Sequence, residues 1–361
     1  MKNEIFSDTS RRLAVIDTRF PWKQSGFRYW ENIEIFRQKP DTLFFATDLY
    51  RDEFPAPVYN FQSFNTIAKK EGITDIYCVF LNLVSSLLGT CYLSDGTYMP
   101  GSNPRFNIKP FLKENDINIH TTLYPGGGLD PSTSTEFLHI AAQNCKTIFT
   151  NINEVLNVIP NSIYLPGLIN TDFYSYAPKS KSKPIQLTFS AHRAERKGFP
   201  LLAQTFNQLD EHFHLNIIGD WQNDLHLITN KNYTFFGLLN PERIKLLYKE
   251  SHVFIYCGTQ DQFALDGFPT TAAADAMATG CVLVSTNPRD DRFILESKVD
   301  YLHVEADVNS ITGTLFWIKE NFKQAMEIGE NGATKIKNYF DSRAIVKSKL
   351  SHIFQSTINN N

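Results

Sequence analysis

The chain has 361 residues, of which 42% are hydrophobic and 20% are charged, and its formal net charge is −3. This composition excludes a disordered, collagen-like or coiled-coil chain, and the length predicts two domains of roughly 150 to 200 residues each. Because acids and bases are balanced, the charge indicates neither a nucleic-acid partner nor another polyanion. One count is unusual, since Phe, Trp and Tyr make up 13% of the chain.

The five cysteines are widely spaced, with no Cys-x-x-Cys pair and no histidine in metal-ligand spacing. We therefore expect free thiols, no bound metal and no cofactor. Residues 1–12 lack the apolar core of a signal peptide, and the longest apolar stretch, residues 76–88, is interrupted by Asn82 and two serines. The sequence predicts a cytoplasmic protein without a transmembrane segment, with peripheral attachment at the inner membrane face as an option.

The first half alternates short apolar runs with mixed segments. The strands we expect there are residues 13–17, 43–47, 75–80, 117–123 and 146–150. The expected helices are residues 28–36 and 63–71. Strands that alternate with helices indicate a parallel sheet with crossover helices.

The pattern lapses over residues 175–184, a polar segment bounded by prolines, which we interpret as a linker. After it the expected strands are residues 185–190, 215–218, 234–236, 253–256 and 282–285. The expected helices are residues 199–209, 241–250, 270–279, 309–322, 322–338 and 342–354. The prediction is an N-terminal domain over residues 1–174, a second α/β domain over 185–340, and a C-terminal helix and tail over 341–361.

The most informative segment runs from Asp266 to Gly280. Pro269 suits the first turn of a helix, so a helix is expected to begin near Pro269 or Thr270, and Gly280 would end it. The exposed amides of such a helix start attract an anion, and the hydroxyl groups of the two threonines at 270 and 271 add donors. Asp275 is an acid within a helix of alanines. The alternative is an ordinary helix start with an alanine face packed on a sheet.

A basic cluster lies between the strand at 185–190 and the next helix. Arg193, Arg196 and Lys197 occupy this loop, at the edge of a parallel sheet where ligands bind. Guanidinium and ammonium groups can neutralise a diphosphate. Such a cluster is also common in solvated loops. Together with the helix start at 267–271, it suggests a site for a nucleotide diphosphate.

These motifs resemble retaining GT-B glycosyltransferases, in particular family 4 (group 1). The resemblance covers about residues 145 to 305, and the order of its motifs is more specific than any one of them. The matching positions are Arg193, Lys197-Gly198, Gly219, Phe235-Phe-Gly237, Asp266-Gly-Phe-Pro269 and Asp275-Ala-Met-Ala-Thr-Gly280. The resemblance implies two Rossmann-like α/β domains that face each other across a cleft, with the C-terminal helix returning to the first.

The resemblance also implies roles for single residues. Arg193 and Lys197 would bind the donor diphosphate, Asp266 would contact the sugar, and Asp275 would hold the ribose. The expected donor-binding residues are Gly267, Phe268, Pro269, Thr270, Thr271, Asp275 and Gly237. Two departures matter, because both acids are glutamates in the family and are usually separated by seven residues rather than eight. An extra residue inside a helix would rotate Asp275 by about 100°.

The N-terminal domain offers weaker candidates for the acceptor site. Gly26 is the best match to the glycine-rich loop that the family carries after the first strand. His120 and Tyr124 are candidates at the strand over residues 117–123, although His120 also fits an ordinary buried strand histidine. Aromatic faces suit sugar rings, so we further expect sugar contacts from Phe20, Trp22, Phe27, Tyr29, Trp30, Tyr124, Phe263 and Phe268.

The leading hypothesis is a retaining glycosyltransferase that moves a sugar from a nucleotide diphosphate sugar, of UDP or GDP type, to an acceptor hydroxyl in glycan or polysaccharide biosynthesis. The acceptor would be a glycan, a lipid-linked glycan or a protein. No Asp-x-Asp pair suits a metal, so a metal-independent reaction is expected. A nucleotide-sugar epimerase on the same fold and a non-catalytic sugar-nucleotide-binding subunit are the alternatives. No Gly-x-Gly-x-x-Gly or Walker motif supports a dehydrogenase or an NTPase.

Overall fold

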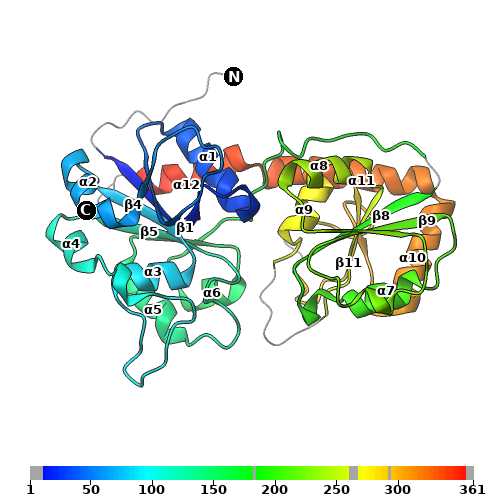
Figure 1. Cartoon of the computed structure of the whole chain (residues 1–361), viewed down its shortest axis with the longest axis horizontal. Helices are drawn as coiled ribbons and strands as arrows, with labels where there is room; N and C mark the ends of the chain where they lie inside the picture. Colours follow the sequence, from blue (N-terminus) through cyan, green and yellow to red (C-terminus); the bar gives the residue numbers. More distant parts are fainter. Residues whose placement is uncertain (1–10, 182–183, 260–266, 292–293, 355–361) are drawn as a thin grey trace. The chain divides into compact units, whose positions relative to one another are not determined.

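The computed structural model describes residues 11–181, 184–259, 267–291 and 294–354. These residues form two compact units, each built on one parallel sheet (Figure 1). Unit 1 contains the described residues up to Leu168 and those from Ser342 onward, and unit 2 contains the described residues from Ile169 to Asp341. The predicted α/β class with two Rossmann-like domains is confirmed.

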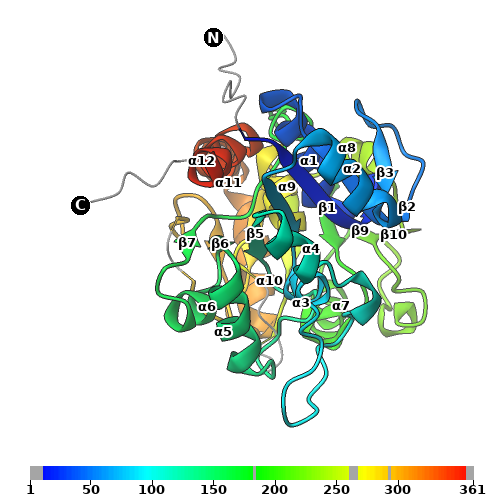
Figure 2. The ribbon, with the colours of Figure 1, turned by 90° about the vertical axis from the view of Figure 1, so that its left-hand side faces the viewer.

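The sheet of unit 1 has seven parallel strands in the order β3-β2-β1-β4-β5-β6-β7. Figure 2 shows β3 and β7 at opposite edges of this sheet. The strands are β1 (Leu13–Phe20), β2 (Leu43–Leu49), β3 (Val58–Asn60), β4 (Asp75–Val79), β5 (Asn118–Leu123), β6 (Thr147–Thr150) and β7 (Ile163–Tyr164). Both faces are covered by helices, which explains why most strand residues are buried.

Two separate cores lie on the two faces of this sheet. On one face α1 (Phe27–Gln38) and α12 (Ser342–Phe354) contribute to the core, so the C-terminal helix packs in unit 1 as expected. The other face is covered by α2 (Phe64–Glu71), α3 (Leu81–Leu88), α4 (Lys109–Glu114), α5 (Thr135–Asn144) and α6 (Asn153–Val158).

The sheet of unit 2 has six parallel strands in the order β10-β9-β8-β11-β12-β13. They are β8 (Ile185–Ser190), β9 (Phe213–Ile218), β10 (Tyr233–Gly237), β11 (Val253–Tyr256), β12 (Val282–Ser285) and β13 (Leu302–His303). On one face lie α7 (Phe199–Phe206) and α10 (Val308–Glu320), and on the other lie α8 (Pro241–Glu250) and α9 (Thr271–Ala278). The long α11 (Phe322–Tyr339) packs against α9 and β12.

The segment before β8 packs on unit 2, so the boundary lies earlier than the predicted linker at 175–184. Tyr174 is buried with its ring centroid 6.2 Å from that of Tyr248. The Lys179 ammonium donates to the carbonyls of Tyr248 and Lys249 at 2.8 and 2.9 Å. These carbonyls end α8, where a cation is favoured.

All the predicted strands and helices are present, with ends that differ by a few residues. No helix among the described residues is long and apolar enough to cross a membrane.

Candidate functional site

The strand order of unit 2 reverses beside β8. From β8 the chain runs outward through β9 to β10, and then returns to place β11 on the other side of β8. In open parallel sheets, ligands bind outside the carboxyl ends of the strands at such a reversal. The loops that follow β8 and β11 therefore lie where a ligand is expected, and the basic cluster is on the first of them.

These two loops touch through their backbones at Gly198. This glycine has φ +74°, and a Cβ added to it would lie 1.7 Å from the carbonyl oxygen of Cys257. A second contact is the hydrogen bond from the Thr259 amide to the Arg196 carbonyl, at 3.1 Å. Only glycine fits this close approach in a left-handed conformation. The contact fixes the loop that carries Arg193 and Lys197.

We expect Gly198→Ala to cost about 1–3 kcal/mol of unfolding free energy, because the new Cβ must displace the backbone at Cys257. Urea unfolding measures this loss. The matched control is Gly313→Ala in the middle of α10, where a Cβ meets no atom within 4 Å and the change should stabilise the helix by up to about 1 kcal/mol. Equal stability of the two variants would contradict the proposed role of the contact.

A second glycine joins the loop after β8 to the turn after β9. Gly219 has φ +126°, and a Cβ on it would lie 2.0 Å from the Ala191 carbonyl oxygen. The same oxygen accepts a hydrogen bond from the indole of Trp221 at 2.7 Å. The Trp221 ring stacks on Phe199 with centroids 4.6 Å apart. The beginning of the basic loop is therefore held by a buried aromatic pair.

Arg193 is engaged by two acids. Its Nε donates to Asp224 at 2.6 Å and its Nη2 donates to the other oxygen of that carboxylate at 3.3 Å. Its backbone amide donates to Asp220 at 2.6 Å. The hydrogen bond from Arg193 holds the pKa of the Asp224 carboxyl below its usual value. The guanidinium is half exposed, so it is oriented by Asp224 while remaining accessible.

Lys197 lies at the end of a short 3₁₀ turn, Glu195–Lys197, directly before Gly198. Its ammonium lies 5.8 Å from the ring centroid of Tyr256, the last residue of β11. This cation–π contact places the charge over the carboxyl end of β11, beside the reversal of the sheet. The structure thus brings both predicted basic residues to one edge of the sheet.

The helix α9 begins as expected. Thr270 is its N-cap, and the Thr270 hydroxyl accepts from the Ala273 amide at 3.4 Å. Within the described residues, no group accepts from the amides of Thr271 and Ala272. These two amides at the positive end of the helix dipole are available to an anion. Gly267 and Pro269 precede the helix, and the Phe268 ring packs against Tyr301 with centroids 4.9 Å apart.

Asp275 lies one turn into α9, on the same side as Thr271. Its carboxylate is partly buried and has no hydrogen-bond partner within the part of the chain that the structure describes. Burial raises the pKa of Asp275 well above its usual value. The helix α9 is a regular α-helix from Thr271 to Ala278, which fixes the position of Asp275 relative to the N-cap Thr270.

The structure describes one of the remaining candidates, Gly237, and does not describe Asp266 and Phe263. Gly237 ends β10, and its carbonyl accepts from the Gly219 amide at 2.9 Å, so it lies at the same edge of the sheet. A Cβ on Gly237 would meet no atom within 4 Å. Asp266, and the aromatic candidate Phe263, lie outside the described residues.

His120 is not at a surface that could bind an acceptor. It is fully buried in β5, and its Nε2 lies 3.1 Å from the Asp75 carboxylate at the start of β4. Burial lowers the pKa of His120, although Asp75 opposes the shift. Burial would raise the pKa of Asp75, but hydrogen bonds from His120 and Arg11 keep it below its usual value. His120 is therefore part of a buried polar cluster near the amino ends of the strands.

Tyr124 is also a core residue rather than a surface one. It is 4% exposed, its ring packs on Phe27 with centroids 4.8 Å apart, and burial raises its pKa. The aromatic candidates Phe20 and Tyr29 are buried in the same core, which corrects the expectation that they contact a sugar. The aromatic candidates that remain partly exposed are Trp22, Phe27, Trp30 and Phe268.

Gly26 does lie at the carboxyl end of β1. It has φ +63°, is partly exposed, and is the N-cap of α1, where the Tyr29 amide donates to its carbonyl at 3.1 Å. The order of the seven strands reverses between β1 and β4, so Gly26 occupies the edge of unit 1 that corresponds to the donor edge of unit 2.

The partners of the basic loop could not be predicted from the sequence. Asp220, Asp224 and the Cys257 carbonyl come from other strands and loops, and only the fold brings them to Arg193 and Gly198. Among the described residues, no group of three or more His, Cys, Asp and Glu side chains could hold a metal ion.

The family described as "Glycosyl transferases group 1" matches residues 171–335. Residues 171–335 of unit 2 are thus similar to group 1 glycosyltransferases. The match confirms the predicted group 1 resemblance and the class of enzyme, a glycosyltransferase, while membership in family 4 stays a prediction. No curated protein sequence matches the chain.

Solved structures with the GT-B fold match the whole chain. A glycosyltransferase from Rickettsia africae has a TM-score of 0.69 at 12% identity, over 96% of this chain and 100% of that one. Anabaena HepE in complex with UDP-glucose has a TM-score of 0.68 at 13% identity, over 94% and 99%. Sucrose-phosphate synthase from Thermosynechococcus elongatus has a TM-score of 0.66 at 13% identity, over 94% and 98%. At these identities the likeness establishes the fold of this glycosyltransferase.

Proposed function

We propose that this group 1 glycosyltransferase transfers a sugar from a nucleotide diphosphate sugar to an acceptor hydroxyl, with retention of the anomeric configuration. The observation that carries the proposal is the pair of cations, Arg193 and Lys197, on a loop fixed by backbone contacts at the reversal of the sheet. The UDP-glucose bound to Anabaena HepE, a protein of the same fold, supports a donor of this class.

In the proposed reaction, the bond between the sugar and the diphosphate breaks and negative charge develops on the departing diphosphate. Arg193 and Lys197 would stabilise this charge electrostatically, and the amides of Thr271 and Ala272 would add hydrogen-bond donors. The charge is compensated by these groups, so we propose a reaction that needs no metal. Asp266 remains the proposed contact to the donor sugar.

We assign the donor ribose to Asp275. A carboxylate that is partly buried, unpartnered and raised in pKa is a typical binding group, because a ligand supplies the hydrogen bonds that the protein does not. The acceptor is proposed to be a glycan, a lipid-linked glycan or a protein, bound at the carboxyl edge of the unit 1 sheet near Gly26.

The exchange Asp275→Asn is expected to change stability and binding in opposite directions. The pKa of Asp275 is raised in the folded state. Its contribution to stability is therefore complete at pH values below its pKa in the unfolded state, and it is lost as the pH rises through its pKa in the folded state. At pH 7.5 the free energy of unfolding of the Asn variant should therefore be higher than that of the wild type by roughly 0.5–2 kcal/mol, and its melting temperature should be higher as well. Near pH 3.5 the two proteins should be equally stable.

In the same variant, the affinity for the nucleotide should fall about tenfold or more, since a charged acceptor for the ribose hydroxyls is lost. Calorimetric titration with nucleoside diphosphates measures this change. An Asn variant that binds nucleotide as tightly as the wild type would rule out Asp275 as the ribose ligand.

Product analysis tests the reaction itself. NMR of the product made from a donor of known anomeric configuration should show the same configuration at the transferred sugar. Incubation of the donor alone separates the epimerase alternative, because an epimerase converts the donor without an acceptor. A product of inverted configuration, or conversion of the donor alone into an epimer, would contradict the proposed transfer.

A further inference from the structure

The segment between α3 and α4 contains a β-hairpin, residues 91–99, and Figure 2 shows this segment extending below α3. The two arms of the hairpin pair through an antiparallel bridge between Tyr92 and Tyr98. Next to this bridge the Leu93 amide donates to the Thr97 carbonyl at 2.9 Å. Because its backbone is hydrogen-bonded internally, the hairpin has a defined conformation before any ligand binds.

The two faces of the hairpin differ. Leu93 and Met99 are buried and belong to the core beneath α3. Tyr92 and Tyr98 point the other way and are 59% and 41% exposed, with ring centroids 5.0 Å apart. The Tyr98 hydroxyl donates to the Ser102 carbonyl, which orients its ring. The buried face attaches the hairpin to unit 1, so the exposed pair of rings is not needed for that attachment.

The base of the hairpin is fixed to the carboxyl edge of the unit 1 sheet, where we place the acceptor. Gly128, in the loop after β5, has φ +85°, and a Cβ on it would lie 2.6 Å from the Met99 sulfur and 3.1 Å from the Pro100 carbonyl oxygen. The Asn82 side chain, at the start of α3, donates to the Gly101 carbonyl at 3.4 Å. The tyrosine pair therefore lies on an extension of the loops that follow β4 and β5.

The tip of the hairpin carries hydroxyl groups and one acid. Ser94, Asp95 and Thr97 are all exposed. The Thr97 amide donates to the Asp95 carboxylate at 2.8 Å, and this hydrogen bond holds the pKa of Asp95 below its usual value. Aromatic rings suit the apolar face of a sugar, and hydroxyl and carboxylate groups suit its hydroxyls. The hairpin thus matches both kinds of surface that a neutral sugar presents.

The composition of the hairpin disfavours a membrane surface as its partner. Residues 90–103 contain no lysine or arginine, the side chains that anionic lipid headgroups attract. The apolar side chains of Leu93 and Met99 are turned into the core, whereas insertion into lipid requires exposed apolar groups. The ionised Asp95 at the tip would in addition be repelled by anionic headgroups.

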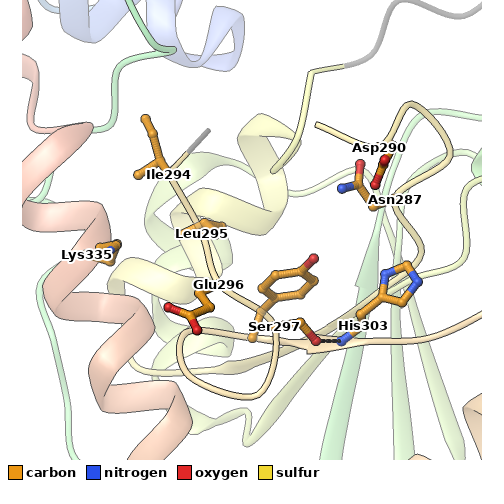
Figure 3. A pocket seen from close by; sticks show the side chains of 9 residues that line it. Asn287, Asp290, Ile294, Leu295, Glu296, Ser297, His303 and Lys335 are labelled. Atoms are coloured by element: carbon orange, nitrogen blue, oxygen red, sulfur yellow. Dashed lines mark hydrogen bonds between the residues drawn. The ribbon is translucent and has the colours of Figure 1, made fainter. Parts of the chain in front are cut away.

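A hollow of about 560 Å³ in unit 2, at the carboxyl ends of β12 and β13, does not offer a comparable surface (Figure 3). Tyr301, the ring in its lining, is only 4% exposed and packs against Phe268. The Asn287 side chain donates to the Asp291 carbonyl at 2.8 Å. These groups are engaged within the protein, whereas the rings of the hairpin are open to a ligand.

We propose that the Tyr92–Tyr98 pair binds a sugar ring of the acceptor, away from the ring that receives the transferred sugar. The inference rests on the proposed function and narrows the acceptor to a neutral glycan of several rings. A chain is required because the pair lies on a hairpin that extends from the loops after β4 and β5, whereas Gly26 follows β1.

Binding can be measured by saturation-transfer NMR on the full chain in excess UDP. The probes are cellotetraose, maltotetraose, mannotetraose and the tetrasaccharide of N-acetylglucosamine, each compared with its monosaccharide. We expect at least one tetrasaccharide to bind the wild type saturably. It should bind at least about fivefold more tightly than its monosaccharide, since only the chain reaches a second contact on the aromatic pair.

Three variants and a control locate the binding. Tyr92→Ala and Tyr98→Ala should each raise the dissociation constant of the tetrasaccharide at least about fivefold. Tyr92→Phe keeps the ring and should bind within about twofold of the wild type. The matched control is Tyr339→Ala on α11, which removes a tyrosine that is 52% exposed and should leave binding unchanged. The melting temperature of each variant separates loss of binding from loss of fold.

The proposal is overturned if none of the tetrasaccharides binds the wild type, if the monosaccharides bind as tightly, or if both alanine variants bind as the control does. Sedimentation with vesicles of equal parts phosphatidylcholine and phosphatidylglycerol tests the membrane alternative. Vesicle binding that is lost in Tyr92→Ala would also overturn the proposal. A failure of UDP to bind in a separate titration counts against the donor site, whereas a failure of the tetrasaccharides counts against the hairpin alone.

Discussion

Replacing Arg193 or Lys197 with alanine should lower kcat/KM for a nucleotide diphosphate sugar by about 10²- to 10³-fold in each case. Each change removes one positive charge that would stabilise the negative charge developing on the departing diphosphate. The Arg193 guanidinium is already oriented by Asp224, so little reorganisation is needed when the donor binds. Steady-state kinetics with saturating acceptor measure the loss.

The matched control is Lys231→Ala, which removes an exposed lysine at the opposite, amino-terminal edge of the same sheet, before β10. It should leave kcat/KM unchanged. Both loop variants should fold normally, because the side chains of Arg193 and Lys197 are half exposed or partly buried rather than in the core. Turnover close to that of the wild type in the Arg193→Ala, Lys197→Ala double variant would refute the assigned roles.

The exchange Lys349→Met should cost about 3–5 kcal/mol of unfolding free energy, the largest stability loss we expect. Lys349 is a fully buried ammonium on α12 that forms an ion pair with Glu31 of α1. It also donates to Tyr77 at 2.7 Å and to Thr122 at 2.9 Å. Methionine has a side chain of similar volume to lysine, but it leaves the Glu31 carboxylate buried without a cation. Urea unfolding measures the change.

Two further variants give this prediction its control. Lys347→Ala, on the exposed side of the same helix, should change stability by about 0.5 kcal/mol or less. The double variant Glu31→Gln, Lys349→Met removes both charges and should recover part of the loss. If Lys349→Met were no more harmful than Lys347→Ala, the ion pair would not be what holds α12 in unit 1.

Most of the fold could be predicted because both sheets are built from short apolar runs separated by helices. The helices α3, α4, α5 and α6 of unit 1 were not predicted, and α3 shows why. The apolar run at 76–88 spans most of β4 and all of α3, and the chain turns between them at Phe80, which has φ +85°. A turn at phenylalanine carries no glycine or proline signal. The two-residue strands β7 and β13 are too short to produce a periodic pattern.

The candidate site was predictable where its residues are close in sequence. Lys197 and Gly198, or Thr270 and Asp275, form local patterns with a clear physical meaning. Burial was harder to predict. His120 lies in β5 and Tyr124 directly follows it, and only the fold reveals that both side chains are buried.

The most direct test of the donor site is the melting temperature of the protein with UDP and GDP. A ligand at 100 times its dissociation constant adds about 2.7 kcal/mol of stability, which raises the midpoint by roughly 3–4 °C for a chain of this length. We predict such a shift for at least one of the two in the wild type and its loss in the Arg193→Ala, Lys197→Ala double variant. No shift with either nucleotide, or an equal shift in the double variant, would contradict the account.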